Sequence, residues 1–108
     1  STSKPEARLC AGPLLMERES CRVYKEGQEI QLTGREYLLL AYFMENADKI
    51  ISKERLYEQV WGEYSSICDN TIMVHIRHLR EKIERNPSNP QQLITVKGLG
   101  YKLKKRSE

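Results

Sequence analysis

One stretch constrains the fold of this chain more than any other, the segment DNTIMVHIRHLREKI from Asp69 to Ile83. Its apolar residues Ile72, Ile76, Leu79 and Ile83 recur at steps of four, three and four. Residues at that spacing share one side of an α-helix, and at about 100° per residue these four fall within about 60° of one another. The stretch is therefore predicted to be a helix that buries one face in a hydrophobic core.

The opposite face of this predicted helix has a composition that exposure to solvent does not explain. It carries Asn70, Val74, Arg77, His78, Glu81 and Arg85. In the DNA major groove, arginine reads guanine, asparagine reads adenine, and a small apolar group contacts the thymine methyl. The face predicts a recognition helix over residues 70–85, with Val74, Arg77 and His78 as its reading surface. A solvated charge is the alternative interpretation of Arg77.

The charge of the chain is divided unevenly along its length. The net charge is +3, with −3 in residues 1–69 and +6 in residues 70–108. The basic part begins at the predicted recognition helix, which favours an anionic partner on that side. A basic half that only aids solubility is the alternative.

Size and composition narrow the class of protein. A chain of 108 residues supports one hydrophobic core. No apolar run approaches the ~20 residues needed to cross a bilayer, and the first residues lack the apolar segment of a signal peptide.

Cys10, Cys21 and Cys68 are odd in number and show no C-x-x-C spacing, so they are predicted to be buried, reduced thiols. The predicted location is the cytoplasm, with no membrane partner.

Short apolar stretches alternate with turn residues from 7 to 32, and this pattern predicts about four antiparallel strands. The strands are expected at RLC, LLM, CRVY and IQL, with Gly27 in the tightest hairpin. Thr33 to Glu36 then fits a capping box, which predicts a helix over residues 34–45. Asn46 is expected to close that helix in the left-handed conformation.

The rest of the chain contains two more helices and a hairpin. Ser52 is predicted to open a short helix that ends near Trp61, with Gly62 after it. Asp69 is the expected N-cap of the recognition helix, and Asn86-Pro87 its stop. Residues 93–103 predict a two-stranded hairpin with a glycine-rich tip. Its expected apolar face holds Ile94, Val96, Tyr101 and Leu103, and its expected polar face holds Thr95, Lys97 and Lys102.

These elements predict an α+β winged helix-turn-helix: an N-terminal four-stranded antiparallel sheet, three helices and a C-terminal β-hairpin wing. In that geometry the third helix enters the major groove and the wing, residues 93–103, reaches the flanking backbone or minor groove. Arg77 is the candidate for bidentate base readout, and Arg80 either meets a phosphate or braces the helix. The predicted DNA-binding residues are Trp61, Asn70, Thr71, Val74, His75, Arg77, His78, Arg80, Thr95 and Lys97.

The segments LTGREYLLLAYFMEN, ISKERLYEQVWG, NTIMVHIRHLREKI and ITVKGLGYKL resemble the OmpR/PhoB-type DNA-binding domain of two-component response regulators. The resemblance covers residues 9–103. It implies an effector domain that binds tandem DNA repeats as a homodimer. It also implies an N-terminal receiver domain, which this chain lacks, controlled by a cognate sensor histidine kinase. The loop with Glu63, Tyr64 and Ile67 is implied to contact RNA polymerase.

Four positions depart from the pattern of that family. Members commonly have Arg where this chain has Asn70, Asp where it has Met73, Arg where it has Lys97 and Pro where it has Gly34. Without the arginine, the resemblance implies one phosphate or base contact fewer at position 70. The NTI-VHIRHLREK variant is similar to the vancomycin-resistance regulators. Residues 1–6 are expected to be a linker or remnant, 7–103 the domain and 104–108 a basic tail.

Other functional classes have little support in the sequence. His75, His78 and Cys68 lack a further well-placed ligand, so no metal or cofactor is predicted. No nucleophile–base pair or phosphate-cradling loop points to an enzyme. Two roles remain open for His75: phosphate contact, which the resemblance implies, and half-buried packing. Glu81 is expected to pair with Arg77 or Arg85. The alternative function is a winged-helix protein-interaction module without direct DNA contact.

Overall fold

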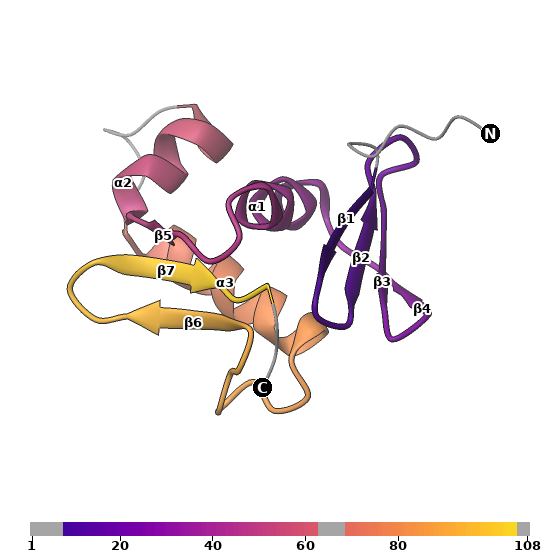
Figure 1. Cartoon of the computed structure of the whole chain (residues 1–108). Helices are drawn as coiled ribbons and strands as arrows, with labels where there is room; N and C mark the ends of the chain where they lie inside the picture. The colour runs from indigo at the N-terminus through magenta and orange to yellow at the C-terminus, as the bar shows by residue number, and fades with distance from the viewer. Residues whose placement is uncertain (1–7, 63–68, 106–108) are drawn as a thin grey trace.

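Residues 8–62 and 69–105 are described by the computed structural model, and for residues 69–71 only the backbone is described. Figure 1 shows an N-terminal sheet, three helices and a C-terminal hairpin. The elements follow in the order β1 (Arg8–Ala11), β2 (Leu14–Glu17), β3 (Arg22–Lys25), β4 (Gln28–Ile30), α1 (Gly34–Glu45), β5 (Ile50–Ile51), α2 (Lys53–Leu56), a π-helical segment (Tyr57–Trp61), α3 (Asp69–Ile83), β6 (Leu93–Val96) and β7 (Gly100–Leu103). The predicted α+β winged-helix architecture is confirmed.

The N-terminal sheet is antiparallel, with strand order β1-β2-β3-β4. Glu26 and Gly27 form a two-residue turn between β3 and β4, and their φ values of 52° and 85° match a type I′ hairpin. This tight turn starts β4 at Gln28, two residues before the strand predicted from the IQL segment. Cys21, predicted to lie in a strand, instead occupies the preceding turn with φ 56°.

Helix α1 lies between the N-terminal sheet and the other helices (Figure 1). The predicted capping box is confirmed: Thr33 Oγ1 accepts from the Glu36 amide at 3.2 Å, and Glu36 Oε1 accepts from the Thr33 amide at 3.1 Å. The prediction for Asn46 is wrong, because its backbone has φ −120° and ψ 40°. Its side-chain amide donates to the Tyr42 carbonyl at 2.9 Å, so this end is capped without a left-handed residue.

The second helical region begins and ends where the sequence predicts. Ser52 Oγ accepts from the Arg55 amide at 3.2 Å, and Gly62 closes the region with φ 81°. Between these caps the α-helix α2 gives way to the π-helical segment, an unforeseen change of helix type. This segment buries Tyr57 and Val60 and leaves Trp61 half-buried.

The C-terminal hairpin belongs to a three-stranded sheet with order β5-β7-β6, in which β5 was not predicted. The expected faces of the wing are correct for β7, where Tyr101 and Leu103 are buried, but wrong for β6. Leu93 pairs with Leu103 and Thr95 with Tyr101, so these residues share the core-facing side. Ile94 and Lys102 share the other side. The core anchor is Leu93, which the face prediction omitted and which is 0% exposed.

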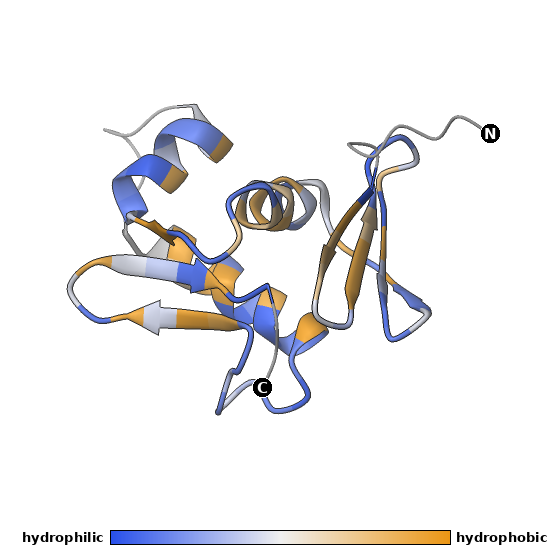
Figure 2. Cartoon of the chain, in the orientation of Figure 1, coloured by the Kyte–Doolittle hydropathy of each residue, from blue (hydrophilic) through white to orange (hydrophobic). Residues whose placement is uncertain are grey.

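Helix α3 buries the four apolar residues that predicted it: Ile72, Ile76, Leu79 and Ile83 are at most 1% exposed. They join one core with apolar residues of α1, the sheets and the second helical region, and Figure 2 shows these apolar residues along α1, α3 and the adjoining strands. The helix includes Asp69, so Asp69 is not its N-cap as predicted. It ends at Ile83, two residues before the predicted limit, and the carboxylate of the next residue, Glu84, binds the chain that leads to β6.

The described residues show whether the cysteines are buried and whether a helix could span a membrane. Cys10 and Cys21 are exposed free thiols, so their predicted burial is wrong, and Cys68 lies outside the described residues. Cys10 lies in the edge strand β1 and Cys21 in the turn before the inner strand β3, and neither belongs to the core of apolar residues. In the described part of the chain, no helix is both long enough and apolar enough to span a bilayer.

Candidate nucleic-acid interface

The outer face of α3 presents the predicted reading surface to solvent. Val74 is 48% exposed, the Arg77 side chain 80% and the His78 side chain 53%. Arg77 Nε lies 3.8 Å from Glu81 Oε2, one helical turn on, which is the pairing expected for Glu81. The side chains of Asn70 and Thr71, also predicted to contact DNA, lie outside the described residues.

Arg80 joins the recognition helix to the wing. Its Nε donates to the Leu93 carbonyl at 2.9 Å, and its Nη2 donates to Thr95 Oγ1 at 2.7 Å. Burial lowers the pKa of Arg80, although an arginine remains charged in this range. Of the two roles predicted for Arg80, the structure supports the brace. Its neighbour Thr95 sits on the core-facing side of β6 but stays exposed.

Glu84 fixes the path from α3 to the wing, a role that was not predicted from the sequence. Its carboxylate is buried, with the residue 6% exposed, and it accepts hydrogen bonds from three consecutive backbone amides. The distances are 3.0 Å from Gln91, 2.9 Å from Gln92 and 2.7 Å from Leu93. Gln92 Nε2 also donates to the Ala11 carbonyl at 2.8 Å, so the start of the wing is tied to β1. These hydrogen bonds therefore fix the position of the first residue of β6 relative to α3.

Glu36 connects the N-terminus of α1 to the recognition helix. Its side chain is 5% exposed and accepts from Lys82 Nζ at 2.6 Å, while His78 Nδ1 lies 3.9 Å from its other oxygen. Burial alone raises the pKa of Glu36, but the hydrogen bonds from Lys82 and the Thr33 amide, with the nearby positive charge, hold it below its ordinary value. A capping carboxylate of α1 thus also orients two side chains of α3.

Trp61 and His75 form part of an aromatic cluster beside α3. Their rings meet edge to face with centroids 5.2 Å apart, and Trp61 meets Tyr57 in the same way at 5.7 Å. The Arg35 guanidinium lies 5.2 Å from the centre of the Trp61 ring and donates to the Val60 carbonyl at 2.6 Å. Of the two roles left open for half-buried His75, this arrangement supports packing.

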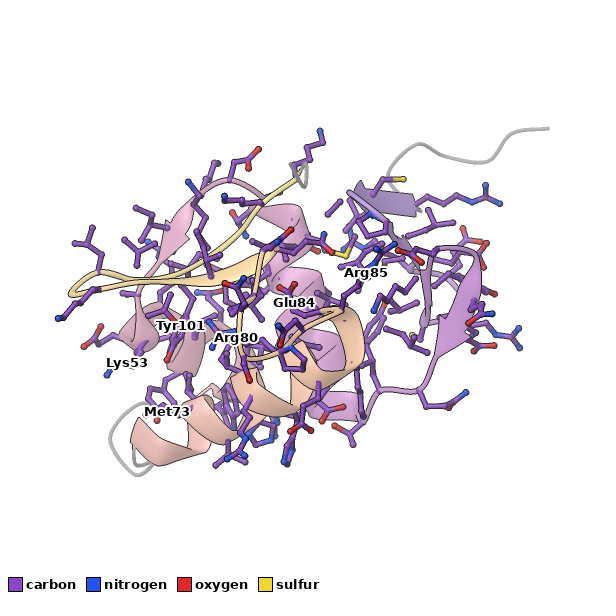
Figure 3. All side chains as sticks on the ribbon, turned by 90° about the horizontal axis from the view of Figure 1, so that it is seen from below. Lys53, Met73, Arg80, Glu84, Arg85 and Tyr101 are labelled. Atoms are coloured by element: carbon purple, nitrogen blue, oxygen red, sulfur yellow. The ribbon has the colours of Figure 1, made fainter. Side chains whose placement is uncertain are left out.

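A groove separates α3 from the wing and unites the predicted reading and wing residues. It encloses about 840 Å³ and is lined by Met73, Val74, Ile76, Arg77, Arg80, Glu81, Pro87, Ser88, Thr95 and Tyr101. Figure 3 shows Met73, Arg80 and Tyr101 on this side of the molecule. Lys97 is exposed in the turn between β6 and β7, beyond the groove. A reading helix, a braced wing and exposed cations therefore lie on one continuous surface.

Residues 27–103 match the family model described as "Transcriptional regulatory protein, C terminal". The chain belongs to this family. Transcriptional regulatory protein YvrH of Bacillus subtilis is 50% identical over 76 residues, which are 70% of this chain and 32% of that protein. The chain thus spans about a third of the length of that relative.

Solved structures of this family share the fold. Response regulator DrrB of Thermotoga maritima, an OmpR/PhoB homologue, superimposes with a TM-score of 0.83 at 26% identity, over 91% of this chain and 44% of that one. The RstA DNA-binding domain of Klebsiella pneumoniae, in complex with the RstA box, gives a TM-score of 0.84 at 22% identity, over 92% and 98% of the two chains. The predicted resemblance to the OmpR/PhoB-type effector domain is confirmed, and the family is one of transcriptional regulators rather than enzymes.

Part of the predicted site of this OmpR/PhoB-type domain has no description in the structure. Glu63, Tyr64 and Ile67 of the predicted polymerase loop, and Cys68 of the rejected metal set, lie outside the described residues. Among the described residues, no cluster of three or more His, Cys, Asp or Glu side chains is placed to hold a metal ion. No signal in the sequence marks the Glu84 clamp, the carboxylate bound to the amides of residues 91–93, because its burial arises only when those residues pack over it.

Proposed function

We propose that this domain binds double-stranded DNA in a sequence-specific manner as the effector domain of a bacterial response regulator in the cytoplasm. The observation that carries the proposal is the shared surface of α3 and the wing, fixed by the Arg80–Thr95 hydrogen bond of 2.7 Å. A recognition helix and a wing held at a fixed separation fit the spacing of adjacent grooves. The complex of the similarly folded RstA domain with the RstA box supports the same assignment.

Within this surface, base readout and backbone contact fall to different residues. Arg77 reads a guanine edge with two donors, and Val74 packs on a thymine methyl. Lys97 contacts phosphate from the wing, and His78 meets either phosphate or a base from the outer face. Trp61 donates its indole N–H to phosphate while its ring stays in the aromatic cluster. Asn70 and Thr71 complete the proposed contact set, while His75, Arg80 and Thr95, which the sequence also predicted to contact DNA, support it through packing and the brace.

The wider assignment follows from the family. We propose that residues 7–103 form the effector domain, with 1–6 as a linker and 104–108 as a basic tail. Two copies bind tandem repeats, and a receiver domain outside this chain, controlled by a sensor histidine kinase, regulates them. Glu63, Tyr64 and Ile67 contact RNA polymerase. Membership of the vancomycin-resistance subgroup stays a prediction that rests on the 70–82 segment alone.

Selection from a random duplex DNA library tests the proposal. The wild-type chain is expected to enrich one motif. Arg77→Ala should enrich the same motif with one position relaxed and bind it about 1–3 kcal/mol more weakly. Arg85→Ala is the matched control, since Arg85 is 81% exposed but pairs with Glu26 at 3.1 Å, away from the groove. Enrichment of no motif by the wild-type chain would overturn the proposal.

A further inference from the structure

Two of the exposed large hydrophobic side chains are neighbours on the outer face of α3. Met73 is 54% exposed and Val74 is 48% exposed. The DNA contacts set out above account for Val74 and leave Met73 without a role. An exposed methionine beside a second exposed apolar residue leaves a larger apolar surface in water than either would alone, and such surfaces mark contact sites.

Met73 occupies a defined place in the groove between α3 and the wing. It lines that groove together with Val74, Arg77, Arg80 and Tyr101. Arg77 follows Met73 by four residues and Arg80 by seven, so all three lie along one side of the helix. Figure 3 shows Met73 toward the N-terminal end of α3, on the side of Tyr101. The methionine is therefore flanked by cations and placed at the end of the helix that base edges approach.

The chemistry of this position selects one feature of DNA. A thioether side chain forms no strong hydrogen bond, so it gains affinity by burying apolar surface. In the major groove, the apolar group on a base edge is the C5-methyl of thymine. A carboxylate at this position would instead accept a hydrogen bond from the cytosine amino group. The groove lining carries two arginines, Arg77 and Arg80, against one carboxylate, Glu81, and this positive balance favours a polyanion over an uncharged protein segment as the occupant of the surface.

We propose that Met73, together with Val74, forms a thymine-methyl contact that makes this domain prefer thymine over cytosine under the N-terminal half of α3. The inference rests on the proposed DNA-binding function. It adds a specificity-determining residue and the base that this residue distinguishes. The flexible methionine covers the methyl on the wing side, while the shorter Val74 covers the outer side.

Deoxyuridine scanning tests the contact, because uracil pairs like thymine and lacks the methyl. Each thymine of the duplex selected by the wild-type chain is replaced in turn, and the dissociation constant is measured. At one or two positions the wild-type chain should bind about three- to fourfold more weakly for each methyl lost. Met73→Ala should bind the thymine duplex more weakly and lose most of that penalty. Met73→Asp should select cytosine at the same position.

The control is Leu38→Ala, which truncates a 48% exposed apolar residue on α1. This variant should keep the full uracil penalty. Uracil replacement that is neutral at every position, in a duplex that the wild-type chain still binds, overturns the methyl contact and leaves the proposed function standing. A penalty unchanged in Met73→Ala likewise overturns the role of Met73. Failure to bind any duplex at low salt would instead remove the proposed function itself.

Discussion

Arg80 of the recognition helix donates a 2.7 Å hydrogen bond to the hydroxyl of Thr95 on the wing. Its Nε holds the Leu93 carbonyl of the same strand at 2.9 Å. The two bonds diverge from one planar guanidinium, so they fix both the distance and the direction of β6 relative to α3. Together with the Glu84 clamp at the start of β6, this arginine sets the placement of the wing relative to α3.

Thr95→Val removes the hydroxyl acceptor at nearly constant volume. We expect the wing to lose part of its orientation and DNA affinity to fall by about 0.5–1.5 kcal/mol for specific and random duplexes alike. Thr95→Ser keeps the hydroxyl and should bind like the wild-type chain. Fluorescence anisotropy with both kinds of duplex measures this. A loss confined to the specific duplex would mean that Thr95 reads bases and does not act through Arg80.

Glu36 makes the stability of the domain depend on pH. Burial raises its pKa, but the hydrogen bonds from Lys82 and the Thr33 amide lower it further, so in the folded protein it lies below the ordinary 4.5. A depressed folded-state pKa contributes stability above the unfolded-state value, and that stability is lost as the pH falls through the folded-state value. Glu36→Gln should cost about 2 kcal/mol at pH 7.

Urea unfolding between pH 7 and pH 3 measures the Glu36 effect. The free energies of unfolding of Glu36→Gln and the wild-type chain should converge as the pH falls below 4.5. Glu45→Gln is the control, because its partner Arg18 and its own side chain are 42% and 38% exposed. An exposed pair of that kind contributes about 0–1 kcal/mol. A constant gap between Glu36→Gln and the wild-type chain across this range would refute the assigned pH dependence.

Glu84→Gln should be among the most destabilising single-atom changes in the domain. The carboxylate accepts from three backbone amides, and a glutamine amide group would turn donors toward at least one of them. A buried amide left without an acceptor costs about 1–3 kcal/mol. Hydrogen exchange of the amides of residues 91–93 should accelerate in step with the loss of stability. Protection as strong as in the wild-type chain would show that the clamp is dispensable.

Two glycines of the wing offer a matched pair of substitutions. Gly98 has φ 81° and open space where a Cβ would lie, whereas at Gly100, with φ 147°, a Cβ would clash with the backbone carbonyl of Ile51. Gly98→Ala should cost only backbone strain, about 1–2 kcal/mol. Gly100→Ala must also separate β5 from β7, so its loss should be clearly larger. Thermal unfolding compares them, and equal losses would contradict the close approach of β5.

Several features that depend only on residues close together in the sequence were predicted correctly. The capping box at Thr33 and Glu36 located the start of α1, and apolar spacing identified the buried face of α3. The same spacing placed Val74 and Arg77 on the outer face, because helix geometry alone determines which residues lie opposite the buried ones. These features need no knowledge of distant segments.

Features that depend on pairing between distant segments were missed or misassigned. In the wing, apolar residues occur on both faces of β6, so their alternation in the sequence does not show which face packs on the core. The pairing of Leu93 with Leu103 decides this. Strand β5 is too short to show a pattern and exists because β7 lies beside it. Glu84 looks like one more surface charge until the chain of residues 91–93 folds over it.

The salt dependence of duplex binding is the sharpest test of DNA binding by α3 and the wing. Binding through cations on α3 and the wing releases counterions, so the logarithm of affinity should fall linearly with the logarithm of salt concentration, with a slope of about −0.9 per phosphate contacted. Lys97→Ala should flatten that slope by about 1 and weaken all sequences alike. If the domain binds no duplex at low salt, or binds it independently of salt, this surface does not bind the DNA backbone and a protein partner is favoured.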